Sequence, residues 1–253
     1  DDTLMPSGRD FIVATRHAAH ETGIQLFDIA DADQGIVHVI SPELGIALPG
    51  LSLICPDSHT CTLGGLGALA WGVGSTEAEH ALATSTLRVT RPQTMRVSFA
   101  GLLGAGVSAK DLILFTIREL SASGGAGYAI EFAGPAIDAL PVEARLTLCN
   151  MTTELSAFTG LIAPDQKVLD YCAGRRYAPQ GQLWDQAAQH WQSLRSDEGA
   201  AFHQEHCFDI GSLKPQLSWG TSPQHCVDWD DAIPHVRDAP DASASAAWQR
   251  AQD

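Results

Sequence analysis

The chain has 253 residues, with 15 basic and 30 acidic side chains and a formal net charge of −15. This acidic balance argues against nucleic acid or an anionic membrane as a partner, because both repel negative charge. No apolar stretch reaches the roughly 20 residues that a membrane span needs, and we expect no secretion signal, because the first residues lack a basic segment followed by an apolar one. Six scattered cysteines without a close pair favour reduced thiols over a disulfide framework. We therefore expect a cytoplasmic protein.

The first hundred residues are predicted to form helices and short strands. Residues 9–21 have the spacing of an amphipathic helix, and residues 25–28 and 36–40 are expected to be strands. Leu51–Cys55 is expected to be a short buried strand, because proline and glycine bound an apolar run. Residues 66–87, rich in small side chains, are expected to form a helix that packs closely on the sheet.

The next segment carries two clear local signals. Thr94–Ala100 alternates between apolar and polar side chains, as a half-exposed strand does. Ser108 is expected to cap a helix whose apolar face includes Ile113 and Ile117, with Asp111 at the position of a capping-box acid. Strands separated by helices in this way predict an α/β architecture.

We expect the chain to divide into three parts. Residues 1–100 would be a partial first α/β domain, and residues 101–210 a second α/β domain. Residues 211–253 become polar and rich in Asp, Ala and Ser, so they are expected to be a linker or the start of a third domain.

The polar tetrad Asp57-Ser58-His59-Thr60 follows the predicted strand at 51–55 directly. In open α/β sheets, ligands bind beyond the carboxyl ends of the strands. A carboxylate, a hydroxyl and an imidazole at that position indicate acid–base chemistry. The alternative is a capped turn without chemistry, because Asp, Ser and Thr are common turn residues.

Motifs along most of the chain, in order, resemble those of the 3-isopropylmalate dehydratase large-subunit family of the aconitase superfamily. The segments that carry the resemblance are Gln34–Val39, Leu48–Gly50, Cys55–Thr60, Gly72–His80, Leu82–Thr84, Gly124–Gly127, Glu131–Gly134, Arg145–Met151, Gly160–Asp165, Ser196–Ala200 and Trp219–Pro223. The resemblance implies aconitase-like three-layer α/β domains, incomplete here because the chain looks like an internal portion of a family member.

The resemblance also implies a function. It is that of a hydro-lyase which isomerises 2-isopropylmalate and 3-isopropylmalate by dehydration and rehydration in leucine biosynthesis. A small subunit would be the protein partner, and a hydroxy-dicarboxylate the substrate. A related dehydratase for citrate or another substituted malate is an alternative.

Carried over residue by residue, the resemblance implies two imidazole–carboxylate pairs. Asp57 would pair with His38, and Glu154 would pair with His59. A carboxylate beside an imidazole fixes its tautomer, as a group that moves protons requires. Without the resemblance, His38 would more simply be a core histidine, and Glu154 a solvated side chain.

Two further residues receive roles in the same way. Ser58 would bind a substrate carboxylate, although it could simply cap the next helix. Asn150 would lie near a 4Fe–4S cluster, the Lewis acid of this superfamily.

The chain departs from the family pattern at the cofactor. Family members carry three cluster cysteines in their C-terminal half, and neither their G-S-C-T-N-like segment nor their C-x-x-C pair occurs here. A preceding Asp-His pair of the family's site is also absent. We therefore expect no cluster ligand in this chain and no activity from it alone, and a cluster-free, non-catalytic binding module is an alternative.

Other motifs are weak or missing. His203 to Cys207 could suggest a zinc site, but its two histidines are three residues apart and no second group of ligands follows. Neither a dinucleotide-binding G-x-G-x-x-G after a strand nor a G-x-S-x-G elbow occurs.

Overall fold

The computed structural model describes residues 5–239 and 241–252 and has an α/β architecture with parallel sheets, as predicted. The helices are α1 (Gly8–Thr22), α2 (Val37–Leu44), α3 (Ser75–Thr84), α4 (Ala109–Leu120), α5 (Pro135–Ala139), α6 (Val142–Asn150), α7 (Gln166–Cys172), α8 (Gln182–Gln192), α9 (Ala242–Gln252) and the 3-10 helices η1 (Ser58–Leu66), η2 (Met151–Leu155) and η3 (Val236–Asp238). The strands are β1 (Ser52–Cys55), β2 (Leu69–Gly72), β3 (Gln93–Ala100), β4 (Tyr128–Ala133), β5 (Thr159–Leu161), β6 (Gln204–Asp209), β7 (Gln216–Ser218) and β8 (Cys226–Asp228).

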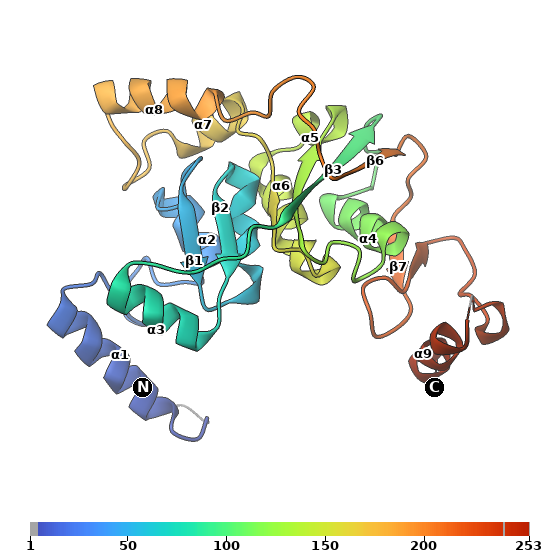
Figure 1. The fold of residues 1–253 in the computed structure, drawn as a ribbon, viewed down its shortest axis with the longest axis horizontal. Coiled ribbons are helices and arrows are strands. Elements are labelled where there is room, and N and C mark those ends of the chain that lie inside the picture. Colours follow the sequence, from blue (N-terminus) through green and yellow to red (C-terminus); the bar gives the residue numbers. More distant parts are fainter. Residues whose placement is uncertain (1–4, 240, 253) are drawn as a thin grey trace.

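The larger sheet is parallel, with strand order β5-β4-β3-β6, and helices α4, α5 and α6 lie beside it (Figure 1). Met95, Val97 and Phe99 of β3 are buried and alternate with partly exposed side chains, which confirms the alternation predicted for this strand. Phe99 and Phe132 stack at the centre of its core with ring centroids 6.3 Å apart, and Ile113 and Leu148 from α4 and α6 complete it.

Helix α4 begins with the predicted capping box. The backbone N–H of Ser108 donates to the Asp111 carboxylate at 2.8 Å, and the backbone N–H of Asp111 donates to the Ser108 hydroxyl at 3.3 Å. Ile113 and Ile117 are fully buried, as expected. A local signal therefore placed this helix correctly.

The smaller parallel sheet pairs β1 with β2, and η1 packs against it. The short strand predicted at 51–55 is confirmed as β1, but the prediction that it is buried is wrong, since Leu51 is 44% exposed and the strand is only partly buried. Gly64 of η1 approaches Gly160 of β5 so closely that a Cβ would lie 1.8 Å from the Gly160 carbonyl oxygen. This contact joins the smaller sheet to the larger one.

Three predicted elements are wrong. Residues 25–28 are not a strand, and residues 36–40 lie largely in helix α2, which packs against η1. The long helix predicted at 66–87 is β2 followed by α3, because Gly72 and Gly74 interrupt it. The helix predicted at 9–21 is confirmed as α1.

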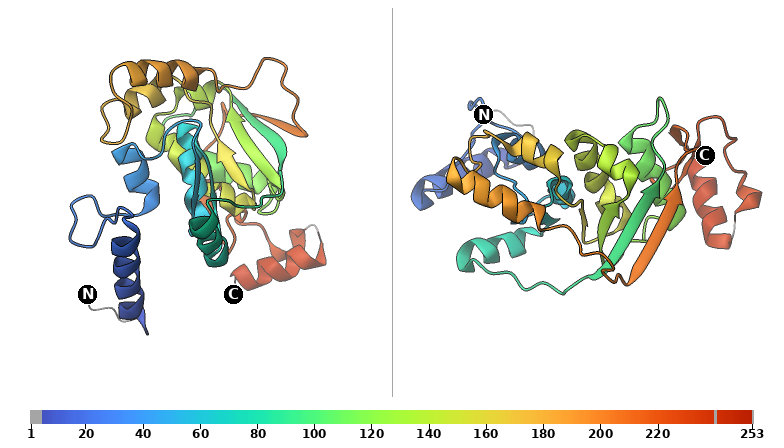
Figure 2. Two further views of the ribbon diagram at one scale, coloured as in Figure 1. Left: turned by 60° about the vertical axis from the view of Figure 1, so that its left-hand side comes forward. Right: turned by 90° about the horizontal axis from the view of Figure 1, so that it is seen from above.

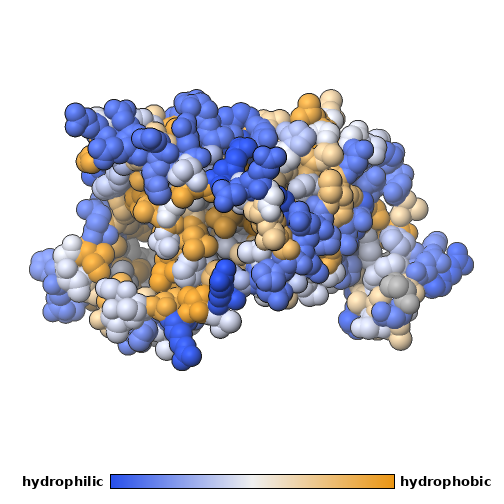
Figure 3. Space-filling model, turned by 45° about the horizontal axis from the view of Figure 1, so that its top comes forward, coloured by the Kyte–Doolittle hydropathy of each residue, from blue (hydrophilic) through white to orange (hydrophobic). Residues whose placement is uncertain are grey.

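The two ends of the chain form outlying helices (Figure 2). Helix α9 forms in the segment that looked like a linker, and the expected boundaries near residues 100 and 210 stay a prediction. Phe11 on α1 is 64% exposed and Leu82 on α3 is 75% exposed. Figure 3 shows apolar side chains across the left half of one face. No helix of the described residues is long and apolar enough to span a membrane.

Candidate active site

The site is built around the turn that follows β1. Asp57 caps the N-terminus of η1, and its carboxylate accepts a hydrogen bond from the backbone N–H of His59 at 2.8 Å. The hydroxyl of Thr60 donates to the Asp57 carbonyl oxygen at 2.6 Å. The hypothesis of a capped turn and that of an acid–base site are therefore compatible, because the capping hydrogen bond also fixes the direction of the Asp57 carboxylate.

His38 reaches the same carboxylate from helix α2. Its Nε2 lies 3.1 Å from Asp57 Oδ1, and its side chain is 12% exposed. The backbone N–H of His59, helped by the nearby imidazoles, lowers the pKa of the Asp57 carboxyl although burial opposes it. An ionised Asp57 accepts, so Nε2 of His38 carries the proton. Its Nδ1 is buried and has no hydrogen-bond partner among the described residues.

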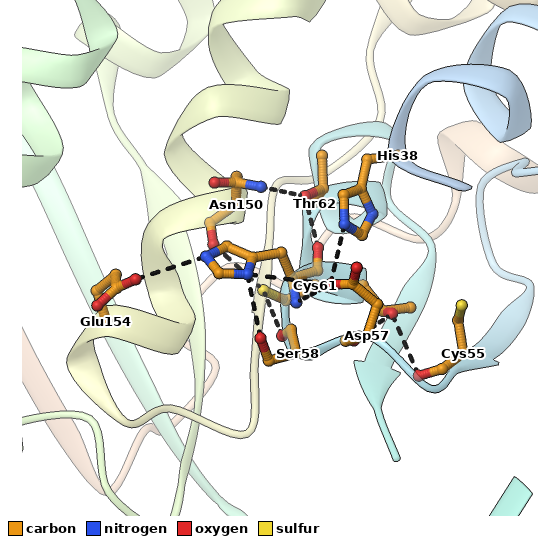
Figure 4. Close-up of polar contacts among 10 residues, drawn as sticks. His38, Cys55, Asp57, Ser58, Cys61, Thr62, Asn150 and Glu154 are labelled. Atoms are coloured by element: carbon orange, nitrogen blue, oxygen red, sulfur yellow. Dashed lines mark hydrogen bonds and ion pairs between the residues drawn. The ribbon is translucent and has the colours of Figure 1, made fainter. Parts of the chain in front are cut away.

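His59 lies between three polar groups, Asp57, Ser58 and Glu154, which Figure 4 labels. Its Nε2 is 3.5 Å from Glu154 Oε1, which is an ion-pair distance, and its Nδ1 is 3.1 Å from the Ser58 hydroxyl. The Asp57 carboxylate is 3.9 Å from the same Nδ1. The imidazole is 34% exposed, so it can both be held by the protein and meet a small molecule. The two imidazoles, His38 and His59, have ring centroids 6.4 Å apart.

Asn150 and Glu154 belong to two consecutive helices. Helix α6 ends at Asn150, and the following helix η2 carries Glu154. The Asn150 side-chain nitrogen donates to the Thr62 hydroxyl at 2.8 Å. The structure thus brings together the six residues singled out in the sequence: His38, Asp57, Ser58, His59, Asn150 and Glu154. Their individual roles stay predictions.

A cavity of 620 Å³ opens beside Asp57 and Ser58. Trp71 and Phe158 lie against each other in its wall, with ring centroids 5.2 Å apart and ring planes tilted by 31°, and Arg88 contributes a positive charge. No carboxylate pairs with Arg88 in the part of the chain that the structure describes. Sequence reasoning missed Arg88, since a lone arginine in a loop gives no signal.

The described residues do not provide a cluster or metal site. Within residues 5–239 and 241–252, no three His, Cys, Asp or Glu side chains gather to hold a metal ion. All six cysteines lie in these ranges as free thiols, and burial raises the pKa of Cys172 to about 11 and raises that of Cys149 well above its usual value. His203 of the suggested zinc motif instead accepts a hydrogen bond from the backbone N–H of Thr94 at 3.1 Å. The residues present therefore do not fit the role of cluster ligands.

Two partly exposed imidazoles held by carboxylates on a parallel α/β scaffold are groups suited to acid–base catalysis. The sequence model of the aconitase family (aconitate hydratase) matches residues 7–253, and the chain belongs to this family. The chain is 52% identical over 249 residues to 3-isopropylmalate dehydratase large subunit 1 of Bradyrhizobium diazoefficiens. That alignment covers 98% of this chain and 52% of the relative, so the chain spans about half the length of this curated relative.

Proposed function

We propose that the chain is part of the large subunit of a cytoplasmic hydro-lyase that interconverts 2-isopropylmalate and 3-isopropylmalate in leucine biosynthesis. The observation that carries this proposal is the meeting of His38, Asp57, His59 and Glu154, from three separate parts of the chain, at one half-exposed site. The identity to a relative of that name supports the choice of substrate.

The reaction removes a weakly acidic proton from carbon and expels hydroxide, so it needs groups that hold and deliver protons. His59 Nε2 is the group that we assign to proton transfer at the leaving oxygen, because Glu154 lies 3.5 Å from it and stabilises a positive charge there. Asp57 holds the backbone N–H of His59 and the ring of His38, and so orients both imidazoles. Ser58 stands next to His59 Nδ1, where it could turn toward a substrate carboxylate.

A bound 4Fe–4S cluster would supply a Lewis acid to this reaction. Its cysteine ligands would come from the half of the relative's length that this chain does not span, since the described residues offer none. Asn150 would border that cofactor. The chain alone is therefore expected to be inactive.

The cavity beside Ser58 suits a small dicarboxylate. Arg88 offers a charge-assisted contact to one carboxylate, and the neighbouring rings of Trp71 and Phe158 offer an apolar surface to an alkyl group. A small subunit is the expected protein partner, because the relative is named as a large subunit.

Interconversion of the two isopropylmalates, followed by proton NMR, tests the proposal. The full-length large subunit would be prepared without oxygen together with its small subunit, and citrate offered in parallel. We expect 3-isopropylmalate to form from 2-isopropylmalate and citrate to remain unchanged. Turnover of citrate or another malate alone would favour the related dehydratase. No turnover of any hydroxy-acid, by a preparation without iron, would favour a cluster-free binding module.

A further inference from the structure

Thr62 forms hydrogen bonds with two residues of the candidate site, His59 and Asn150. It lies in η1 three residues after His59, it is 5% exposed, and its hydroxyl donates to the His59 carbonyl oxygen at 2.6 Å. The same hydroxyl oxygen accepts a hydrogen bond from the side-chain nitrogen of Asn150 at 2.8 Å. One buried side chain therefore contacts both the histidine segment and the helix that leads to Glu154.

The direction of these two hydrogen bonds is fixed by the number of protons. A threonine hydroxyl has one proton, and a carbonyl oxygen can only accept, so the proton of Thr62 goes to His59. The hydroxyl is then left as an acceptor toward Asn150. The amide of Asn150 must present its NH₂ group to Thr62, because its oxygen would meet another oxygen without a proton between them.

This arrangement decides where the other half of the amide points. Figure 4 shows Asn150 Oδ1 directed away from Thr62, and no described residue donates a hydrogen bond to it. If the amide were flipped, Asn150 Oδ1 would face the Thr62 hydroxyl oxygen with no proton between them, and burying two such acceptors costs free energy. We propose that Thr62 is a positioning residue that fixes the amide orientation of Asn150 and so presents Oδ1 as an acceptor in the site. The consequence for catalysis rests on the proposed function, but the orientation itself does not.

The composition of the chain makes a direct test possible, because Asn150 is its one asparagine. The 253-residue chain labelled with ¹⁵N-asparagine should give a single side-chain NH₂ signal pair. We expect its exchange with water to be at least about tenfold slower than in free asparagine, because the donor is hydrogen-bonded and shielded. In Thr62→Val this exchange should be at least about fivefold faster than in wild type, and in Thr62→Ser it should be as slow as in wild type.

Thr116→Val is the matched control. Thr116 is also fully buried and donates to a helix carbonyl, that of Leu112, at 2.8 Å, but it does not contact Asn150. Its variant should leave the Asn150 signal unchanged. Exchange that is equal in wild type and Thr62→Val would overturn the proposal. If Thr62→Val fails to fold, two other results would overturn the proposal equally. One is exchange of the wild-type Asn150 NH₂ group at the rate of free asparagine, and the other is loss of its protection in Thr62→Ser.

Activity of the assembled enzyme supplies a second readout. Thr62→Val should lower kcat by about tenfold with KM changed by less than about twofold, and Thr62→Ser should restore kcat. An unchanged kcat in Thr62→Val would count against a positioning role. A wild-type enzyme without isomerase activity would contradict the proposed function alone, since the exchange measurement does not depend on it.

Discussion

The carboxylate of Asp57 accepts the backbone N–H of His59 at 2.8 Å, so one side chain both starts helix η1 and fixes the segment that carries the imidazole. The same N–H is the main reason why the pKa of Asp57 is lowered. A carboxylate with this partner stays ionised across the range in which enzymes work. It can therefore orient the imidazoles around it without competing for their protons.

Replacing Asp57 by Asn should separate orientation from folding. Asn caps helices about as well as Asp, so η1 and the thermal stability should be nearly unchanged. The charge beside the two imidazoles is lost, and we expect kcat of the assembled enzyme to fall by about 100-fold. Circular dichroism and a kinetic assay measure the two effects. Asp170→Asn, a change of an exposed carboxylate on α7, is the control and should have neither effect. Turnover near the wild-type value in Asp57→Asn would contradict its role.

Arg88 should matter for substrate binding more than for turnover. Arg88 lines the cavity and forms no ion pair with a carboxylate of the described residues, so Arg88→Gln is expected to raise KM for a dicarboxylate by about tenfold. Arg91 lies three residues further in the same exposed loop and does not line the cavity, so Arg91→Gln is the matched control. Steady-state kinetics distinguish the two variants. Equal KM values would remove Arg88 from the proposed binding site.

The stability of the folded chain should depend on the buried Arg145. Arg145 is 1% exposed and its guanidinium lies 2.5 Å from the Asp165 carboxylate. Asp165→Asn leaves this charge unpaired, and we expect a loss of about 3 kcal/mol of the free energy of unfolding at neutral pH. Urea titrations of the variant, with Asp170→Asn as control, measure it.

The same pair predicts a pH dependence. Burial alone would raise the pKa of Asp165, but the hydrogen bonds from Arg145 and from backbone N–H groups outweigh it and lower the pKa below its usual 3.8. A carboxyl group with a lowered pKa in the folded state stabilises the fold above its unfolded pKa, and loses this contribution as the pH falls through the folded value. The difference between wild type and Asp165→Asn should therefore shrink below about pH 4. A constant difference down to low pH would contradict the ion pair.

The contact between Gly64 and Gly160 predicts a steric effect. A Cβ at Gly64 would lie 1.8 Å from the backbone oxygen of Gly160. Because the clash is with backbone, no side-chain movement can relieve it, and Gly64→Ala should destabilise the fold by about 2 kcal/mol or more. Gly104→Ala places its Cβ 3.9 Å from the nearest atom in an exposed loop and should be neutral or slightly stabilising. Melting temperatures of both variants decide this. Equal stability of the two would show that η1 and β5 do not pack this closely.

Local signals explain which elements the sequence predicted correctly. The alternation of β3 and the capping box of α4 involve neighbouring residues, so they are visible without the fold. Helix α2 was missed because its first residues, Val37 to Ile40, include β-branched side chains that favour strands, while packing against η1 decides the outcome. Strand β2 was missed because it has four residues, with glycine at its end.

The site was predictable in part. Asp57, Ser58 and His59 stand together in the sequence, and the family resemblance added His38, Asn150 and Glu154. Thr62 and Arg88 gave no signal, because a hydroxyl that accepts from Asn150 and a cation that lines a cavity depend on contacts between distant segments. Such contacts are set by tertiary packing, which no local pattern encodes.

The proposed proton transfer depends on the pairing of His59 with Glu154, so the decisive experiment is to measure the turnover of Glu154→Gln in the assembled large and small subunits. Gln keeps the shape of the side chain but removes the charge 3.5 Å from His59 Nε2. We predict that kcat falls by about 100-fold or more while the fold is retained, and that Glu143→Gln, an exposed change on α6, has no effect. A kcat within about twofold of wild type for Glu154→Gln would contradict the assignment of His59 and Glu154 to proton transfer.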